Sequence, residues 1–199
     1  MFAKRLFDLI VTVPAMLVAL PFMLIIAVWV KFGDGGPVLY VQQRVGKRGR
    51  LFGILKFRTM VVNSDSAGPA VTAKNDSRIT PVGRILRKSK LDELPQLFNV
   101  IMGDMSLVGP RPEVLEYIDC YPQAAKEKVL SVRPGITDRA AIEFRNEETL
   151  LANSSNPERT YVEEVLPVKI DYYLQYVSNR TFLGDIRILL KTIMVVLFK

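Results

Sequence analysis

The chain has 199 residues, of which 49% are hydrophobic and 24% are charged, and its formal net charge is +7. It contains no histidine and a single cysteine, Cys120. This composition excludes histidine general acid–base catalysis, histidine-ligated metal sites, an intrachain disulfide and a cysteine zinc cluster. The positive charge favours an anionic partner such as a nucleic acid, a phospholipid surface or a phosphorylated substrate.

An apolar run of 22 residues without a charged side chain occupies positions 9–30. As a helix it would reach about 33 Å, near the thickness of a bilayer core. Pro14 and Pro21 each remove a backbone donor and tend to kink a helix. The basic flanks, residues 4–5 and Lys31, both favour the cytoplasmic side. Two topologies stay open: one kinked transmembrane helix, or a helix that turns back inside the membrane at a proline.

The next part of the chain predicts a β-hairpin. Residues 38–43 and 51–60 have strand character, and residues 44–50 form a basic, glycine-containing turn between them. A polar loop is expected over 61–77, followed by a short helix rich in arginine and lysine over 81–89.

Helices dominate the remainder. Helical spacing of apolar residues predicts an amphipathic helix over 92–102. Further helices are expected over 113–129 with an interruption near Pro122, over 147–151, over 157–177 with a break near Pro167, and over 185–199. The last of these has an apolar stripe flanked by basic residues, so it either lies flat in the headgroup region or packs on the core of the domain.

Adjacent carboxylates at the start of the 92–102 helix are the strongest chemical signal. Asp92 and Glu93 can serve phosphoryl transfer, because that chemistry needs charge neutralisation and positioning rather than a histidine. A carboxylate can also act as a covalent nucleophile, and carboxylate oxygens suit Mg²⁺. The structural alternative is that Asp92 caps the helix and Glu93 is an ordinary first-turn acid.

Several cations accompany this pair. Lys56 and Arg58 lie two apart in the predicted strand and face one side of it, where they form either part of the site or a solvated sheet face. Arg87 precedes Asp92 by five residues. Arg111 stands between two prolines that fix its backbone, and its guanidinium suits phosphate. Arg133 precedes another Pro-Gly turn and is a further candidate ligand.

Seven segments carry a resemblance that extends from residue 4 to residue 195. They are residues 4–8, 43–46, 56–60, 91–99, 103–106, 109–112 and 133–137. In order and spacing they resemble the bacterial sugar transferases, the monotopic phosphoglycosyl transferases. No single segment is specific, but the combination is.

The resemblance implies an enzyme that transfers a sugar-1-phosphate from a UDP-sugar to undecaprenyl phosphate, giving undecaprenyl-diphosphosugar and UMP. Asp92 would be the nucleophile that forms a phosphosugar-enzyme intermediate, with Mg²⁺ on the diphosphate and Asp92 as its protein ligand. Glu93 would assist in proton handling or in positioning the metal and the dyad. Lys56, Arg87 and Arg111 match basic positions near that site.

The resemblance also implies an architecture. We expect an α+β, predominantly helical, membrane-associated domain with a small β-hairpin, interfacial amphipathic helices and a re-entrant N-terminal helix that breaks at Pro21. Residues 1–32 would be embedded in the membrane, and residues 33–199 would form a cytoplasmic catalytic domain at the membrane interface. The location would be the cytoplasmic face of the bacterial inner membrane, where assembly of surface glycans begins. The chain would be a minimal catalytic unit; whether it is a homodimer stays open.

One region departs from the family pattern. Residues 138–146 differ from the more familiar sequence in the part that is expected to contact the nucleotide sugar, so the identity of the sugar stays open. Arg145 is the candidate ligand there.

The alternative function is a non-enzymatic, membrane-anchored basic adaptor that binds anionic lipid or nucleic acid. The net charge and the apolar anchor favour it. Against it, the sequence has no nucleic-acid-binding motif, and an adaptor leaves the acidic pair and residues 110–112 unexplained. We therefore expect no nucleic-acid partner.

Overall fold

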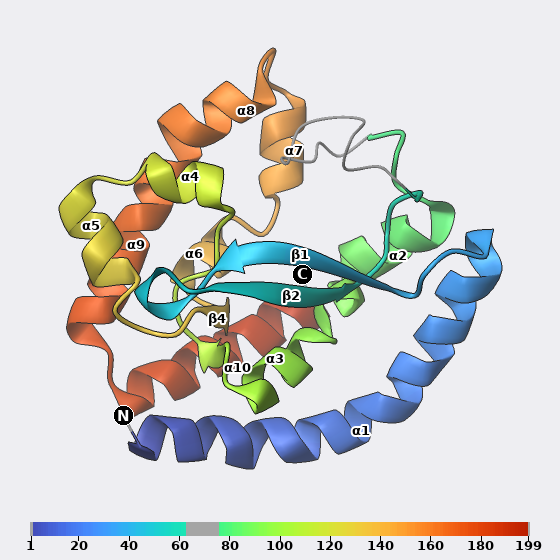
Figure 1. The fold of residues 1–199 in the computed structure, drawn as a ribbon, viewed down its shortest axis with the longest axis horizontal. Coiled ribbons are helices and arrows are strands. Elements are labelled where there is room, and N and C mark those ends of the chain that lie inside the picture. The colour runs from blue at the N-terminus through green and yellow to red at the C-terminus, as the bar shows by residue number, and fades with distance from the viewer. Residues whose placement is uncertain (1, 63–75, 199) are drawn as a thin grey trace.

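The computed structural model describes residues 2–62 and 76–198, so the loop predicted over 61–77 lies largely outside the described residues. A small hairpin lies among many helices, as the sequence predicts, with α1 along the outer edge (Figure 1). In chain order the elements are α1 (Phe2–Asp34), β1 (Leu39–Val45), η1 (Lys47–Gly49), β2 (Leu51–Phe57), α2 (Pro81–Ser89), η3 (Leu91–Glu93), α3 (Gln96–Met102), β3 (Ser106–Val108), α4 (Leu115–Asp119), α5 (Gln123–Val129), β4 (Gly135–Thr137), α6 (Arg139–Glu143), α7 (Glu147–Ala152), α8 (Pro157–Thr160), η4 (Tyr161–Val165), α9 (Leu166–Asn179) and α10 (Phe182–Phe198).

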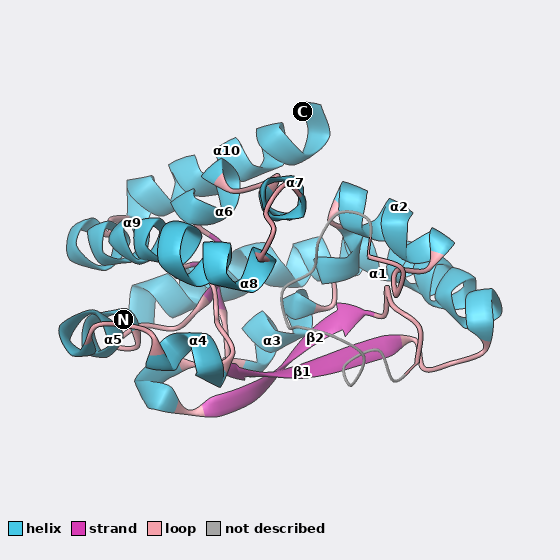
Figure 2. Ribbon diagram, turned by 90° about the horizontal axis from the view of Figure 1, so that it is seen from above, coloured by secondary structure: helices cyan, strands magenta, loops and turns pink. Residues whose placement is uncertain are grey.

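The hairpin is antiparallel, with Leu39 opposite Phe57 and Val45 opposite Leu51. Its turn contains Arg48 and Gly49 at positive φ. Phe52 and Ile54 are buried on the face that meets the helices, whereas Leu39, Val41 and Leu51 on the strands are exposed. Figure 2 shows the hairpin at one edge of the molecule with most of the helices on one side of it. Lys56 lies two residues beyond Ile54 and therefore in the same row, so the face of β2 that meets the helices supplies both core side chains and a cation of the site.

A second pair of strands, β3 and β4, was not predicted from the sequence. The two strands are parallel, with Ser106 opposite Gly135 and Val108 opposite Thr137. Each has three residues, which is too short to show a periodic pattern. The helix α6 was also not predicted. The irregularity predicted near Pro167 is present, because the π-helical turn η4 ends at Val165 and α9 begins at Leu166 with Pro167 in its first turn, a position that tolerates proline.

Helix α1 is continuous through both prolines over its 33 residues. The helix bends, and its two halves run in different directions (Figure 1), so the change of direction occurs without a gap in the helix. A bend without unwinding is the ordinary effect of a proline in a helix interior. One face of α1 is buried on the domain through residues spaced along its whole length: Asp8, Thr12, Met16, Met23, Ile26 and Val30.

Both ends of α1 are fixed to the same folded body. Near the first turn, Arg5 donates to the carbonyl oxygens of Val100 and Ile101 at 2.6 and 2.9 Å. Asp8 is 1% exposed and accepts a hydrogen bond of 2.8 Å from Ser106. At the other end, Asp34 is paired with Arg58. The opposite face of α1 is apolar and exposed, and the helix is long and apolar enough to cross a membrane by length and composition.

Candidate active site

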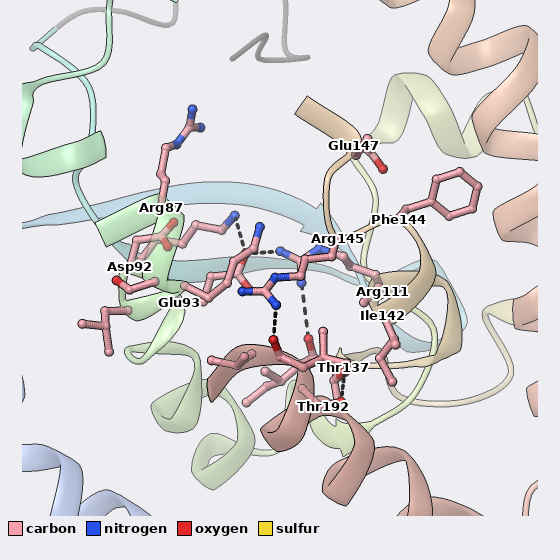
Figure 3. A pocket seen from close by; sticks show the side chains of 18 of the residues that line it. Arg87, Asp92, Glu93, Arg111, Thr137, Ile142, Phe144, Arg145, Glu147 and Thr192 are labelled. Atoms are coloured by element: carbon pink, nitrogen blue, oxygen red, sulfur yellow. Dashed lines mark hydrogen bonds and ion pairs between the residues drawn. The ribbon is translucent and has the colours of Figure 1, made fainter. Parts of the chain in front are cut away.

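A cavity of about 410 Å³ opens between the hairpin, the η3 turn, α6–α7 and the second half of α10 (Figure 3). Asp92, Glu93, Lys56, Arg87, Arg111 and Arg145 all line it. The structure thus gathers both predicted carboxylates and four of the six predicted cations, which come from segments far apart in the chain. We call this cavity the site pocket.

Asp92 lies in the 3-10 turn η3, before the helix that the sequence placed it in. It makes no capping hydrogen bond, because α3 begins only at Gln96 and its N-cap position is Pro95. The Asp92 side chain is 7% exposed, and its Oδ1 atom has no hydrogen-bond partner within the described residues. A buried carboxylate oxygen without a partner is costly to stability, so the capping alternative does not account for Asp92.

Burial, and next the neighbouring charge of Glu93, raise the pKa of Asp92 from its usual 3.8 to about 6. The carboxylate is still mostly ionised at neutral pH, and its oxygens are more basic than those of an ordinary aspartate. A basic carboxylate on a residue that lines a cavity is suited to nucleophilic attack.

Glu93 is in the opposite situation. Its Oε1 atom accepts a hydrogen bond from Arg111 and another, at 3.4 Å, from Nζ of Lys56. Although burial opposes it, the charges of Arg111 and Lys56 lower the pKa of Glu93 well below its usual range, and Glu93 in turn raises that of Arg111. Glu93 is therefore a permanently ionised anchor for two cations, which fits a positioning role better than proton handling.

Two crossing turns explain why Arg111 is rigid. Gly109 N donates to Thr137 O at 3.1 Å, and Gly135 N donates to Pro110 O at 2.9 Å. A Cβ atom added at Gly109 would lie 2.7 Å from the carbonyl oxygen of Arg133, so the two chain segments need glycine to approach each other. The two glycine–proline motifs therefore form one unit that aims Arg111 at Glu93.

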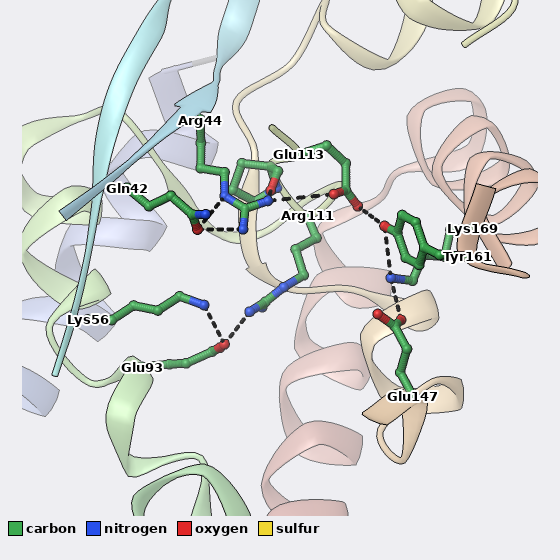
Figure 4. A network of polar contacts seen from close by, with 10 residues as sticks. Gln42, Arg44, Lys56, Glu93, Arg111, Glu113, Glu147, Tyr161 and Lys169 are labelled. Atoms are coloured by element: carbon green, nitrogen blue, oxygen red, sulfur yellow. Dashed lines mark hydrogen bonds and ion pairs between the residues drawn. The ribbon is translucent and has the colours of Figure 1, made fainter. Parts of the chain in front are cut away.

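A buried polar network continues behind Arg111 (Figure 4). Arg44 donates to Pro112 O at 3.3 Å and pairs with Glu113, which accepts a hydrogen bond of 2.8 Å from the Tyr161 hydroxyl. Beyond Tyr161, Nζ of Lys169 lies 2.5 Å from Glu147. The network links the hairpin, the Pro-Arg-Pro turn, α9 and α7 around the site pocket.

Helix α7 is held at the rim of the site pocket from two directions. Glu147 pairs with Lys169, and Glu148 pairs with Arg87 at 3.5 Å. Arg145, just before α7, donates to the carbonyl oxygen of Val195. Arg87 and Arg145 therefore reach the site pocket but are engaged with protein groups there.

Arg58 and Arg133 do not reach the site pocket. Arg58 follows the end of β2 and is 7% exposed, where it pairs with Asp34 and donates to Pro37 O at 2.6 Å. Arg133 donates to Gly103 O at 2.8 Å. The expectation that Arg58 shares a face with Lys56 assumed a strand through residue 60, but β2 ends at Phe57.

The donor set fits one magnesium ion only together with substrate oxygens. Within the described residues, no group of three or more Cys, His, Asp or Glu side chains could hold a metal ion. Mg²⁺, however, commonly takes one or two carboxylates and completes its shell with water and phosphate oxygens. The unpartnered Oδ1 of Asp92 is a suitable protein ligand of this kind, whereas Glu93 is already engaged with cations.

Sequence reasoning missed the residues of the buried network, including Glu113, Tyr161 and Lys169. Lys169 carried a detectable signal: it occurs among Leu166, Ile170 and Tyr173 at helical spacing. A lysine on an apolar helix stripe needs a buried partner. The partner itself, Glu147, could not be identified because it depends on how α7 packs against α9.

A family model described as bacterial sugar transferase matches residues 1–199, the whole chain. The chain belongs to the bacterial sugar transferase family. Membership agrees with the site, because a sugar transferase that works on phosphorylated substrates requires the cations that surround Asp92 and Glu93.

Individual bacterial sugar transferases are similar over nearly all of this chain. The undecaprenyl-phosphate galactose phosphotransferase of Salmonella typhimurium is 41% identical over 98% of the chain, and the UDP-glucose:undecaprenyl-phosphate glucose-1-phosphate transferase of Xanthomonas campestris is 41% identical over 96%. The exopolysaccharide production protein ExoY of Sinorhizobium fredii is 36% identical over 96%. The chain spans 40% and 38% of the length of the first two relatives and 84% of ExoY.

Proposed function

We propose that this bacterial sugar transferase moves a sugar-1-phosphate from a UDP-sugar to undecaprenyl phosphate, giving undecaprenyl-diphosphosugar and UMP. The observation that carries the proposal is Asp92: a buried carboxylate with a raised pKa and an unpartnered oxygen, in a cavity lined by cations. The names of the relatives support the acceptor and, for the Xanthomonas protein, the UDP-sugar donor.

In the first step, an Asp92 oxygen attacks the sugar-bearing phosphorus of the donor. A bond forms between that oxygen and phosphorus, the bond from phosphorus to the bridging diphosphate oxygen breaks, and UMP leaves with that oxygen. Lys56 and Arg111, held by Glu93, neutralise the charge that develops on the phosphoryl oxygens. Magnesium, held by Asp92 and the diphosphate, would add to this neutralisation when bound.

In the second step, an oxygen of the acceptor phosphate attacks the phosphorus of the phosphosugar attached to Asp92. The bond to Asp92 breaks, so the carboxylate returns to its starting state and the product is a lipid diphosphosugar. The positions of Lys56 and Arg111 serve both steps, because both substrates present phosphate oxygens at the same point.

The location we propose is the cytoplasmic face of the bacterial inner membrane. Helix α1 would lie in the bilayer through its exposed apolar face while its two ends stay with the catalytic domain on one side. This arrangement would hold Asp92 near the headgroup plane, where the acceptor phosphate lies, and the positive charge would attract both anionic substrates.

The test is release of UMP by the purified protein in detergent or nanodiscs, with a panel of UDP-sugars, undecaprenyl phosphate and Mg²⁺. We expect UMP with at least one donor, and Asp92→Asn should abolish it. Turnover by Asp92→Asn at the wild-type rate would contradict the proposal, as would a wild-type protein that releases no UMP but binds oligonucleotides in a salt-sensitive way.

A further inference from the structure

The site pocket has two chemically different sides. The charged side holds Asp92, Glu93 and the cations. The lining also contains aliphatic residues of the η3–α3 segment, α6 and α10, which we call the apolar wall: Leu91, Leu94, Leu97, Ile142, Val195 and Val196. Phosphoryl transfer between polar groups gives no reason for such a wall.

The apolar wall continues to the outside of the molecule. Leu91 and Val196 line the site pocket and are also 38% and 37% exposed. Next to Val196 on α10, Ile193, Met194 and Phe198 are exposed. Inside, Leu97 of α3 and Val195 of α10 pack against the same hydrophobic cluster, so the two helices bring their parts of the apolar wall together.

The acceptor chemistry of the proposed function, on which this inference rests, places an apolar chain at this point. In a polyprenyl phosphate the isoprenoid is esterified directly to the phosphate. When the phosphate reaches Asp92, the first isoprene units must lie within a few bond lengths of the charged side. The donor, by contrast, carries a sugar, a ribose and a uracil, all of which are polar.

We propose that the apolar wall is the binding site of the first isoprene units of the acceptor. The chain leaves the site pocket between the C-terminal turns of α10 and the η3–α3 corner, toward the exposed apolar residues of α10. Arg145, which donates to the Val195 carbonyl, marks the boundary between the phosphate and the isoprenoid parts of this site. Burial of isoprenoid carbons on the wall supplies acceptor affinity.

The test compares Val196→Asn, on the wall, with Leu190→Asn, a matched control on the same helix. Leu190 is 56% exposed and does not line the site pocket. We expect Val196→Asn to raise KM for undecaprenyl phosphate by roughly tenfold, the effect of a changed apolar contact in a pocket. KM for the UDP-sugar should stay unchanged, and Leu190→Asn should change neither constant.

Equal acceptor KM values for the two variants, or a raised donor KM in Val196→Asn, would overturn the inference. Val196→Ala is the second variant, because it removes apolar area without adding polarity, and it should raise the acceptor KM by a smaller factor. A failure of the proposed function is distinguishable, because then the wild-type protein itself would release no UMP.

Photo-crosslinking gives a readout that is independent of turnover. A polyprenyl phosphate with a diazirine on its first isoprene unit should label peptides from η3–α3 and α10, and Val196→Asn should reduce that label. Labelling of α1 alone would contradict the assignment.

Discussion

Asp92 and Glu93 are neighbours in the chain, yet their environments are opposite. Glu93 is neutralised by Lys56 and Arg111, whereas Asp92 is buried with one oxygen unpartnered. The fold thus stabilises one carboxylate and destabilises the charged form of the other. Destabilised groups of this kind are typical of sites where chemistry takes place.

This contrast predicts opposite stability effects of two isosteric substitutions. Because the pKa of Asp92 is raised to about 6, its ionisation weakens the fold above that pH, and Asp92→Asn should raise the free energy of unfolding at pH 7.5 by on the order of 1–3 kcal/mol. Glu93→Gln leaves two partly buried cations without their carboxylate and should lower it by about 1–3 kcal/mol. Chemical unfolding in detergent measures both.

The pH dependence of the Asp92→Asn effect is the control. The gain should shrink as the pH falls from 7.5 to 4 and should vanish at about pH 3 and below, where Asp92 is protonated in both the folded and the unfolded state. A gain that does not change between pH 4 and pH 7.5 would show that charge burial at Asp92 is not its cause.

Activity should depend on the ionisation of Asp92. Since its pKa is about 6, kcat/KM for the UDP-sugar should be level above pH 7 and fall about tenfold per unit at pH values below 6. Glu93 contributes no further limb above pH 5, because its pKa is lowered.

Asp138 requires a separate control because burial raises its pKa to about 6 as well. It caps α6 through Ala141 N at 2.9 Å and does not line the site pocket. The Asp138→Asn variant should therefore keep the acidic limb in the activity profile. Loss of the limb in that variant would reassign the ionisation.

At the scale of elements, the helices and strands that depend on local sequence were predicted correctly, whereas those that depend on contacts between distant segments were not. The predicted and observed ranges of α2 agree. Thr80 is its N-cap residue, and the Thr80 hydroxyl oxygen accepts a hydrogen bond of 2.9 Å from Gly83 N. The hairpin followed from its strands and basic turn. The strands β3 and β4 exist only because two distant glycine turns cross, and no local pattern encodes such a crossing.

The residues of the candidate site also fall into those that local sequence predicts and those that it does not. Motif spacing identified Asp92, Glu93 and Arg111, which lie in rigid local turns. The position of Arg58 depended on where β2 ends, and the position of Lys169 depended on how α9 packs, so neither could be predicted from the sequence. The apolar side of the site pocket likewise comes from helices that meet only in the folded chain.

Helix α7 provides an element-scale prediction through its pair with α9. The Lys169 side chain is 7% exposed and that of Glu147 is 26% exposed, and Lys169→Met should cost about 1–3 kcal/mol of stability because the partly buried Glu147 carboxylate loses its partner. KM for the UDP-sugar should also rise, since Phe144, Arg145, Glu147 and Glu148 line the site pocket.

The matched control is Lys191→Met. Lys191 pairs with Glu143 at 3.0 Å, but both side chains are at least half exposed, so the change should stay within about 0.5 kcal/mol. Equal destabilisation by the two variants would refute a special role of the buried pair.

At the scale of the whole molecule, the attachment of α1 restricts its topology. A helix of 33 residues is about 50 Å long and could cross a bilayer. However, Arg5 is bound to α3 and Asp34 to Arg58. The two ends cannot lie on opposite sides of a membrane while both contacts exist.

This topology predicts the labelling of single cysteines in intact cells. With the exposed Cys120 replaced by serine, a cysteine at position 3 and one at position 35 should both be protected from a membrane-impermeant reagent until the inner membrane is permeabilised. Labelling of position 3 alone from the periplasm would establish a crossing helix and refute the topology.

The central claim is that an oxygen of Asp92 carries the phosphosugar between the two substrates. Intact-mass spectrometry after mixing the protein with its UDP-sugar and Mg²⁺, without acceptor, tests it most directly. We expect the protein to gain the mass of one sugar phosphate, mapped to the peptide that contains Asp92, and to lose it on addition of undecaprenyl phosphate. An adduct that persists in Asp92→Asn, or an active wild-type protein that forms no adduct and releases UMP only with acceptor present, would contradict the claim.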